Sequence, residues 1–427
     1  MSNDEMRLCT QAVRRIGACA LICLSASAWG GPGNGINIAS WVFSPHLELN
    51  LTHDSNVYKD YTNTIDDIYF EPELGLRFGS STDTNLFSVR GNLFYSEREY
   101  NNEKNRNFTT YGDNVTLRIG NGRKSLLELI QAYRSLDDND RHASDIESSV
   151  LSGEMVEDSN TLDLEREIHQ LGASLSRRMT DKLELALSYR YSGVMYENLT
   201  HDRLDPKDLG VPYGLDLDGH IWQLDGALGL TDKTDAFLTL RQGLQYQEQT
   251  EDPAELTTIR VGLKTQGTEK LAYTAGGGLE RYERPTETED ESDVTFNFAA
   301  SADWFITEKL TFRCGGFNGT QFSSFYENNG LQFISGWAGF GYRWKPSVIF
   351  SVRGVYREDD YLDPVTHQGV TQDRLDKRLE GHARVDYLAP GGFLRLYLEG
   401  TYDEVDSNFD FVDYEDQRLI LGANIRY

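Results

Sequence analysis

The chain of 427 residues is poor in cysteine, methionine and proline, with 4, 5 and 10 of them respectively. Cys9, Cys19 and Cys23 lie close to the N-terminus, so the rest of the chain keeps Cys314 alone. A framework of disulfides is therefore excluded for that part of the chain. Beyond the N-terminal segment no apolar run approaches the ~20 residues that a spanning helix needs, which excludes a bundle of transmembrane helices.

Positive charge is also scarce. Lys and Arg number 41 against 68 Asp and Glu, which gives a net charge of −27. Nucleic acid is excluded as a partner, because phosphate contacts need Lys and Arg in excess. A hydrophobic content of 39% is nevertheless too high for a disordered acidic chain. The 23 tyrosines and 20 phenylalanines favour strands over helices.

The N-terminus has the parts of an export signal. Arg14 and Arg15 precede a short apolar stretch, Ile16 to Leu24, which is followed by small residues up to Ala28. A basic region, a short apolar region and a small-residue cleavage site are typical of a secretory signal. We therefore predict a signal peptide over residues 1–28.

From Trp41 onwards the dominant pattern is strict alternation of apolar and polar residues, as in Leu419, Leu421, Ala423 and Ile425. This period of two predicts β-strands with one apolar face. The sequence contains about 18 such segments, a number typical of a large antiparallel barrel, or 16 if two poorly alternating segments are left out. They lie near 41–58, 67–79, 85–99, 106–120, 124–136, 161–177, 182–192, 218–230, 235–246, 256–266, 270–282, 292–305, 309–321, 330–344, 348–357, 372–388, 393–403 and 412–427.

The connections between these segments alternate between short and long. Several short ones repeat a Thr-Asp/Glu-Lys turn, for example at Thr180 and Thr307, whereas 137–160 and 193–217 are long and acidic. Short turns at one end and long loops at the other are typical of outer-membrane barrels. The glycine run 276–278 lies inside a predicted strand and predicts a bend or bulge there.

A soluble β-sandwich would show the same alternation, so two further features decide between the folds. Aromatic residues at the ends of the apolar face predict two membrane-interface girdles. These are Trp304, Trp344, Tyr387 and Tyr427 beside short turns, and Tyr191, Tyr356 and Tyr402 beside long loops. The opposite face carries Arg90, Arg118, Arg190, Arg241, Arg260, Arg313, Arg343, Arg353, Arg384 and Arg395.

Burying those arginines in a sandwich would cost several kcal/mol for each unpaired one, whereas a water-filled lumen removes the cost. We therefore predict an all-β fold, a single antiparallel up-and-down barrel in the outer membrane. It has short periplasmic turns and long acidic extracellular loops. In this prediction residues 29–40 form a periplasmic segment and residues 41–427 form the barrel.

Two segments resemble a known family. The first strand, Leu51-Thr52-His53-Asp54-Ser55-Asn56-Val57-Tyr58, resembles the opening Y-D-S-N-V segment of the beta-barrel porin 2 family, with His53 in place of the tyrosine. That family includes barrels encoded with exopolysaccharide production systems. The last strand resembles the assembly signal of outer-membrane barrels through Leu421, Ala423, Ile425 and Tyr427. The resemblance implies contacts with outer-membrane lipid, lipopolysaccharide, the barrel assembly machinery and components for polysaccharide export.

The sequence thus predicts a porin-like channel for polar solutes, whose arginines set the selectivity, or a conduit for exopolysaccharide export. Two alternatives stay open. His53 and Ser55 resemble the H-x-S-N segment of outer-membrane lipid hydrolases and would act as base and nucleophile. A structural or adhesive barrel without transport is the second alternative. Metal and nucleotide motifs are lacking, so we expect no cofactor and no enzyme activity.

Overall fold

The computed structural model describes residues 35–57, 64–80, 86–120, 124–137, 165–196, 217–247, 252–284, 291–322, 330–367, 370–409 and 413–426. The main sheet has 19 strands, of which β1 lies outside the ring and the other 18 close into a barrel. The predicted all-β antiparallel barrel and its strand count are confirmed. The predicted signal peptide, most of the two long loops and Tyr427 lie outside the described residues.

The ring strands follow one another in chain order, and each predicted segment corresponds to one of them. Their bounds are β2 (Trp41–Asp54), β3 (Asp67–Ser80), β4 (Phe87–Tyr100), β5 (Phe108–Gly120), β6 (Ser125–Asp137), β7 (Glu165–Arg178), β8 (Leu183–Tyr196), β9 (Leu217–Thr231), β10 (Thr234–Gln247), β11 (Ala254–Thr268), β12 (Leu271–Arg284), β13 (Glu291–Phe305), β14 (Leu310–Phe322), β15 (Gly330–Lys345), β16 (Val348–Tyr361), β19 (Leu375–Leu388), β20 (Leu394–Ser407) and β21 (Tyr414–Arg426).

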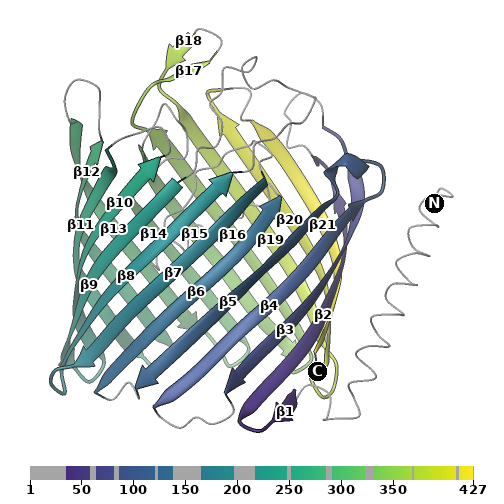
Figure 1. Ribbon diagram of the computed structural model, residues 1–427, viewed down its shortest axis with the longest axis horizontal. Helices are drawn as coiled ribbons and strands as arrows, with labels where there is room; N and C mark the ends of the chain where they lie inside the picture. The colour runs from purple at the N-terminus through teal and green to yellow at the C-terminus, as the bar shows by residue number, and fades with distance from the viewer. Residues whose placement is uncertain are drawn as a thin grey trace.

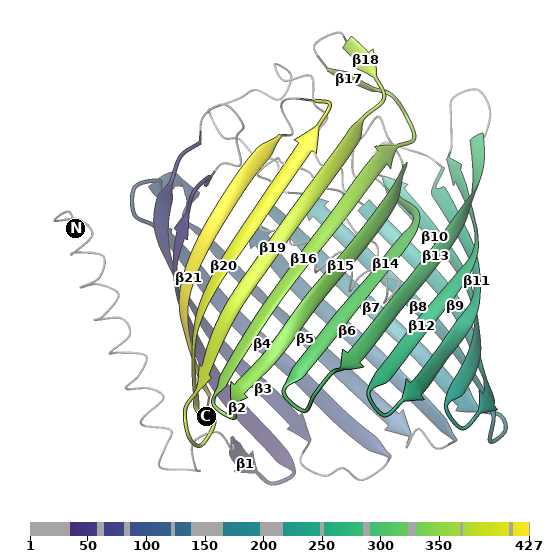
Figure 2. The ribbon, with the colours of Figure 1, turned by 180° about the vertical axis from the view of Figure 1, so that it is seen from behind.

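The first and last strands close the ring. β2 pairs with β21 in a register that runs from His46 opposite Arg426 to Asp54 opposite Arg418. Every ring strand therefore has two neighbours, and the tilted strands continue around the whole wall in the front and back views (Figures 1 and 2). A closed ring pairs the backbone N–H and C=O groups internally, which a wall in hydrocarbon requires.

Alternation sorts the side chains between the two faces of the wall. In β21, Leu419 and Leu421 project outward with exposed fractions of 54% and 59%, while Asp416, Arg418 and Asn424 project inward and are buried. The same pattern recurs on strand after strand, so an outer band of apolar side chains surrounds the wall. Smaller buried clusters lie on its inner side, such as Phe317, Leu331, Phe333 and Tyr361. No helix in the described part of the chain is long and apolar enough to cross a membrane.

The Thr-Asp/Glu-Lys repeat has a structural reason. In the β7–β8 turn the Thr180 hydroxyl accepts hydrogen bonds from the backbone N–H groups of Lys182, at 3.2 Å, and Leu183, at 3.0 Å. Thr307 makes the same pair of bonds in the β13–β14 turn. The hydroxyl satisfies N–H groups that the tight turn would leave unpaired, so one short sequence recurs at this end of the barrel.

Three short strands were not foreseen. β1 (Ile36–Ile38) forms a hairpin with the start of β2 inside the segment predicted over 29–40. β17 (Val365–His367) and β18 (Val370–Gln372) form a hairpin that extends beyond the ring between β16 and β19 (Figure 1). Each strand of this hairpin is three residues long, which is too short for the alternation of apolar and polar residues to show in the sequence.

Candidate functional site: the lumen wall

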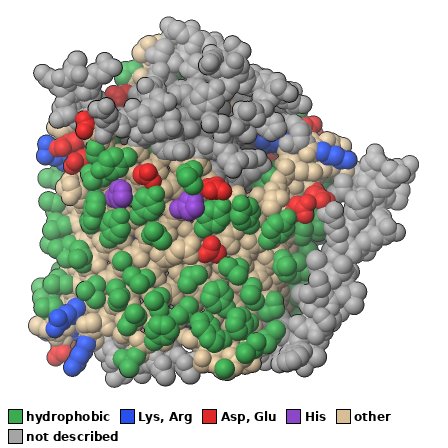
Figure 3. All heavy atoms as spheres, viewed as in Figure 1, with side chains coloured by type: hydrophobic (Ala, Val, Ile, Leu, Met, Phe, Trp, Pro, Cys, Tyr) green, Lys and Arg blue, Asp and Glu red, His purple; other side chains and the backbone are tan. Residues whose placement is uncertain are grey.

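The arginines predicted to line the bore share one face of the wall. Arg118 lies opposite Glu128, Arg313 opposite Asp303, and Arg384 opposite Glu399. Directly opposed residues of antiparallel strands project from the same face, and the exposed leucines of these strands project from the other. The charged face is therefore the inner one. In Figure 3 the outer wall is mostly hydrophobic, and Lys and Arg side chains lie near its two ends.

Three inward arginines on β8, β10 and β11 form a cluster that we call the arginine arc: Arg190, Arg241 and Arg260. Arg241 lies within electrostatic reach of the other two and of Glu280 on β12. Arg260 Nε donates a hydrogen bond of 2.8 Å to Asn297 Oδ1. Among the described residues, Arg241 Nε is buried without a hydrogen-bond partner. Two guanidinium groups, those of Arg241 and Arg260, thus face the one carboxylate of Glu280, which leaves this part of the wall positive.

The carboxylate of the arc is fixed by β14, which separates from β13 near its end while it stays paired with β15. β14 pairs with β13 only as far as Asn318, opposite Phe298. Beyond that point the backbone N–H of Thr320 donates to Glu280 Oε2 at 2.6 Å, and Phe322 packs against Tyr282. The end of β14 therefore bends into the lumen and holds Glu280, so this carboxylate has a defined position beside the arginines.

The Asn318 side chain takes the place of the lost ladder where β14 separates. Its Oδ1 accepts from the Phe298 N–H at 2.6 Å, and its Nδ2 donates to the Phe296 carbonyl at 2.9 Å. A side-chain amide offers one donor and one acceptor, as a peptide group does. Sequence reasoning missed this separation, and Asn318-Gly319 within an alternating strand was the one signal for it.

Across β19 and β20 the inward charges are balanced. Arg384 binds Asp386 at 2.9 Å and Glu399 at 2.8 Å, and Arg395 binds Asp386 at 2.7 Å. His382 lies 3.5 Å from the same Glu399. Positive and negative groups here neutralise each other, so this part of the wall differs from the arginine arc.

Three inward rings each lie between a glycine of the neighbouring strand and an arginine. A Cβ on Gly315 would lie 2.7 Å from Trp337 Nε1, and the Arg353 guanidinium lies 5.3 Å from the centre of that indole. Tyr397 lies over Gly422 in the same way, with Arg384 at 3.7 Å from its ring. The third case is Phe94, over Gly112, with Arg134 at 5.9 Å. The absent side chain lets each ring lie flat on the wall, which keeps the bore wide.

The outer ends of the strands hold buried ion pairs. Arg378 binds Glu380 at 2.8 Å and Asp403 at 3.0 Å, and its side chain is 4% exposed. Similar pairs join Arg374 to Asp376, Arg357 to Asp359, and Arg418 to both Asp416 and Asp54. Sequence reasoning placed Asp359 beyond the end of the segment 348–357. The structure instead places it in the wall, and each of these carboxylates has a guanidinium partner.

The predicted aromatic girdles can be located for every residue except Tyr427. Trp304, Trp344 and Tyr387 lie beside short turns with exposed fractions of 48%, 53% and 45%. At the other end Tyr356 is 44% exposed, and the Tyr402 hydroxyl donates to Glu404 at 2.8 Å. The rings project outward from the wall, the position that an interfacial girdle requires.

The segment with His53 and Ser55, the candidate hydrolase motif, lies where β2 and β21 close the barrel. The Ser55 hydroxyl accepts from the Gln417 N–H at 2.7 Å and lies 3.5 Å from Asp416 Oδ1, and Asn56 Nδ2 donates to the Glu415 carbonyl at 2.9 Å. The His53 ring lies 3.8 Å from Asp66. Ser55 and Asn56 thus continue the β2–β21 seam where the backbone ladder ends, a structural use of this segment.

Among the described residues no group of three or more His, Cys, Asp or Glu side chains is arranged to hold a metal ion.

Comparison with known proteins gives fold resemblances. No family model and no curated protein matches the chain. Among solved structures, Pseudomonas aeruginosa OpdQ shares 13% identity at a TM-score of 0.48, over 91% of this chain and 98% of that one. P. aeruginosa OpdK with vanillate shares 14% at 0.47, over 90% and 99%. Acinetobacter baumannii OccAB4 shares 12% at 0.48, over 90% and 98%. Values this low carry no inference about what the present chain transports.

The geometry itself defines the class of the protein. Eighteen strands close without a free edge, apolar side chains cover the outside, and charged side chains line the inside. Such a wall is stable in a bilayer and surrounds an aqueous bore. The chain is an outer-membrane β-barrel of the porin type.

Proposed function

We propose that this barrel is a channel for polar solutes with a preference for anions. The observation that carries the proposal is the centre of the arginine arc, where Arg241 and Arg260 face the single carboxylate of Glu280. An anion ~7 Å from one excess positive charge gains about 0.6 kcal/mol at the dielectric constant of water and about 2.4 kcal/mol at an effective value of 20. Even the lower figure favours anions over neutral solutes roughly threefold.

Reversal potentials across a salt gradient, measured on the purified barrel in planar bilayers, test this proposal. We expect anion selectivity that falls in Arg241→Gln and falls further when Arg260→Gln is added. Arg177→Gln removes the same charge from the outer face of β7 and is expected to leave selectivity unchanged. Cation selectivity of the unaltered barrel, or equal effects of Arg177→Gln and Arg241→Gln, would contradict the proposal.

A second candidate within this function is a conduit for an acidic exopolysaccharide, supported by the three ring–arginine pairs. The Phe94 and Trp337 rings are partly exposed, so a sugar ring can contact them, and the adjacent guanidinium groups suit uronate carboxylates. It would place the chain in the beta-barrel porin 2 family, with polysaccharide export components and the assembly machinery as partners. Uronate oligosaccharides should then block the current, and Trp337→Ala should weaken the block. Trp304→Ala, on the outer face, is the control, and block by neutral sugars alone would favour a general pore.

The hydrolase alternative has a direct test as well. Because Ser55 accepts a hydrogen bond from the last strand, Ser55→Ala should weaken the seam and leave hydrolysis of phospholipid or lipid A at the background level. Loss of a measured lipid hydrolysis in Ser55→Ala would reinstate His53 and Ser55 as a catalytic pair. A barrel that passes no current under any voltage would instead favour the structural or adhesive alternative.

A further inference from the structure

A group of polar and aromatic side chains interrupts the apolar outer wall. Tyr133 on β6 lies opposite His169 on β7, and both share the outward face with Leu171, which is 51% exposed. On the next strands Tyr191 lies opposite His220. Figure 3 shows histidine and acidic side chains within the hydrophobic wall on this side of the barrel. We call the group the polar patch: Tyr133, Glu167, His169, Tyr189, Tyr191, Asp218, His220 and Trp222.

Hydrogen bonds organise the polar patch into two networks. In the first, the Tyr133 hydroxyl donates to Glu167 at 2.9 Å, and the His169 ring lies 3.7 Å from the same carboxylate. In the second, the Tyr191 hydroxyl donates to Asp218 at 2.6 Å, and the Tyr189 hydroxyl lies 2.9 Å from His220 Nδ1.

These side chains also remain accessible from outside. His169 is 41% exposed and Glu167 is 30% exposed. Tyr191 belongs to the aromatic girdle beside the long loops, so the patch lies at the level of the lipid head groups, where its exposed polar groups can bind the polar part of a lipid.

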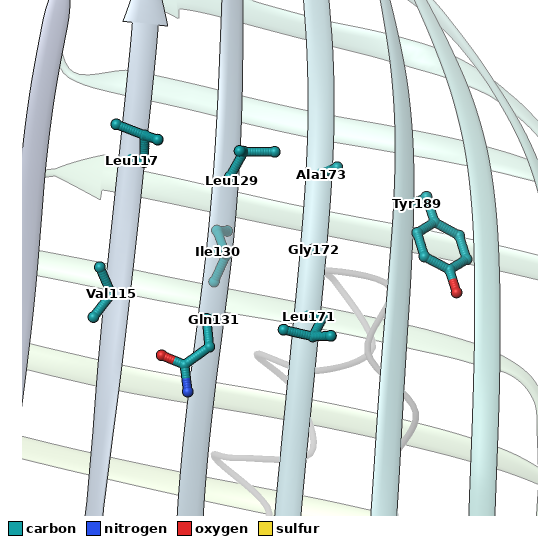
Figure 4. A pocket seen from close by; sticks show the side chains of 9 residues that line it. All are labelled: Val115, Leu117, Leu129, Ile130, Gln131, Leu171, Gly172, Ala173 and Tyr189. Atoms are coloured by element: carbon teal, nitrogen blue, oxygen red, sulfur yellow. The ribbon is translucent and has the colours of Figure 1, made fainter.

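An apolar hollow lies directly beside the polar patch. Its volume is about 400 Å³, and its outward lining includes Leu117, Leu129, Leu171 and Ala173 (Figure 4). The small side chain of Ala173, between Leu129 and Tyr189 in the register, leaves the space open. Along β7 the wall passes from Ala173 and Leu171 in the hollow to His169 and Glu167 toward the long-loop end. The apolar hollow lies toward the middle of the membrane and the hydrogen-bonding patch lies toward the long-loop end. Acyl chains and head group have the same order in a lipid of the outer leaflet.

The chemistry of the patch selects the head group. Tyrosine, tryptophan and imidazole rings offer faces for a sugar ring, and carboxylates accept hydrogen bonds from sugar hydroxyls. The described outward residues of β6–β9 above the hollow include no Lys or Arg to pair with a phosphodiester. On β13, by contrast, Val294 and Phe296 face outward, 63% and 61% exposed, a surface for acyl chains alone.

We infer that this face is a binding site for an acylated sugar lipid of the outer leaflet, the lipid part of lipopolysaccharide. One acyl chain occupies the hollow, and a sugar ring lies on the polar patch. The site recognises the sugar ring rather than the phosphates of the lipid, because the side chains of the polar patch are aromatic or form hydrogen bonds. It is independent of what passes through the bore.

Native mass spectrometry of the purified barrel in phospholipid nanodiscs containing lipid A tests the inference. We expect about one lipid A per barrel, retained equally when the lipid is dephosphorylated. Ala173→Trp fills the hollow and should reduce retention at least ~10-fold, the effect of about 1.4 kcal/mol. Glu167→Leu with His169→Leu should do the same from the patch. Ala300→Trp adds the same side chain to the outer face of β13 and should retain the lipid.

Folding of every variant is checked by heat-modifiable migration and by ion conductance, so a lost lipid is not confused with a lost barrel. Equal retention by Ala173→Trp and the unaltered barrel would overturn the inference, as would equal losses in Ala173→Trp and Ala300→Trp. Retention that needs the phosphates would overturn recognition through the sugar. Pairing of two barrels through this face without bound lipid A would assign it to a second copy instead.

Discussion

Replacing Arg378 by methionine should strongly destabilise the outer end of the barrel. The Arg378 side chain is 4% exposed, and its guanidinium contacts Glu380 at 2.8 Å and Asp403 at 3.0 Å. Asp403 also accepts from the Tyr414 hydroxyl at 2.8 Å. Arg378→Met would leave two carboxylates buried without their cation. Breaking a buried pair in this way costs about 3–5 kcal/mol, so we expect a loss of that size in the free energy of unfolding.

Urea unfolding in lipid vesicles, followed by tryptophan fluorescence, measures this loss. Arg281→Met is the matched control, because the Arg281 side chain is 59% exposed and its ion pair with Glu283 should contribute about 0–1 kcal/mol. Adding Glu380→Gln and Asp403→Asn to Arg378→Met removes the stranded charges and should restore much of the stability. A loss below ~1 kcal/mol for Arg378→Met would refute the assignment of a buried, mutually dependent cluster.

Two further predictions concern the bore and the turns. Gly315→Leu should push the Trp337 ring off the wall and lower the single-channel conductance. Gly316→Leu, on the outer face, is the control and should leave the conductance unchanged. Equal conductances of the two variants would contradict the flat placement of the ring. Thr180→Ala removes the acceptor for two turn N–H groups and should cost about 0.5–1.5 kcal/mol of unfolding free energy, with Thr180→Ser close to the unaltered barrel.

Alternation was sufficient to find the ring strands but not their outer ends. β16 was expected to end at residue 357 and reaches Tyr361, and β20 was expected to end at 403 and reaches Ser407. The acidic residues there are typical of solvated loops, and nothing within β20 shows that Asp403 binds Arg378 of β19. Such pairing depends on neighbouring side chains in the closed wall, which a period of two cannot reveal.

The glycine run shows the same limit. A bend or bulge was expected at residues 276–278, but β12 keeps an unbroken register with β11 and β13 through these glycines. A Cβ on Gly276 would meet the Phe237 ring from β10 at 2.7 Å. The glycine is needed for a ring two strands away, so its reason lies in the tertiary structure rather than in the local backbone.

The face of each arginine followed from alternation, whereas its electrostatic role depends on the register of the neighbouring strands. Arg384 lies opposite Glu399 and is neutralised. Arg241 lies opposite Thr258 on one side and Gln223 on the other, neither of which carries a charge. The excess positive charge therefore collects on β10 and β11, although the arginines are spread around the sequence.

The net charge of −27 is a poor guide to the field inside the bore. The carboxylates of Asp359, Asp376 and Asp403 each bind a buried guanidinium and act as local dipoles. Exposed acidic groups elsewhere are screened within ~10 Å at 0.1 M salt. If net charge governed permeation, lowering the salt would shift the channel toward cations. If the arginine arc governs it, anion preference persists and strengthens, because the arc lies on the wall that the solute passes.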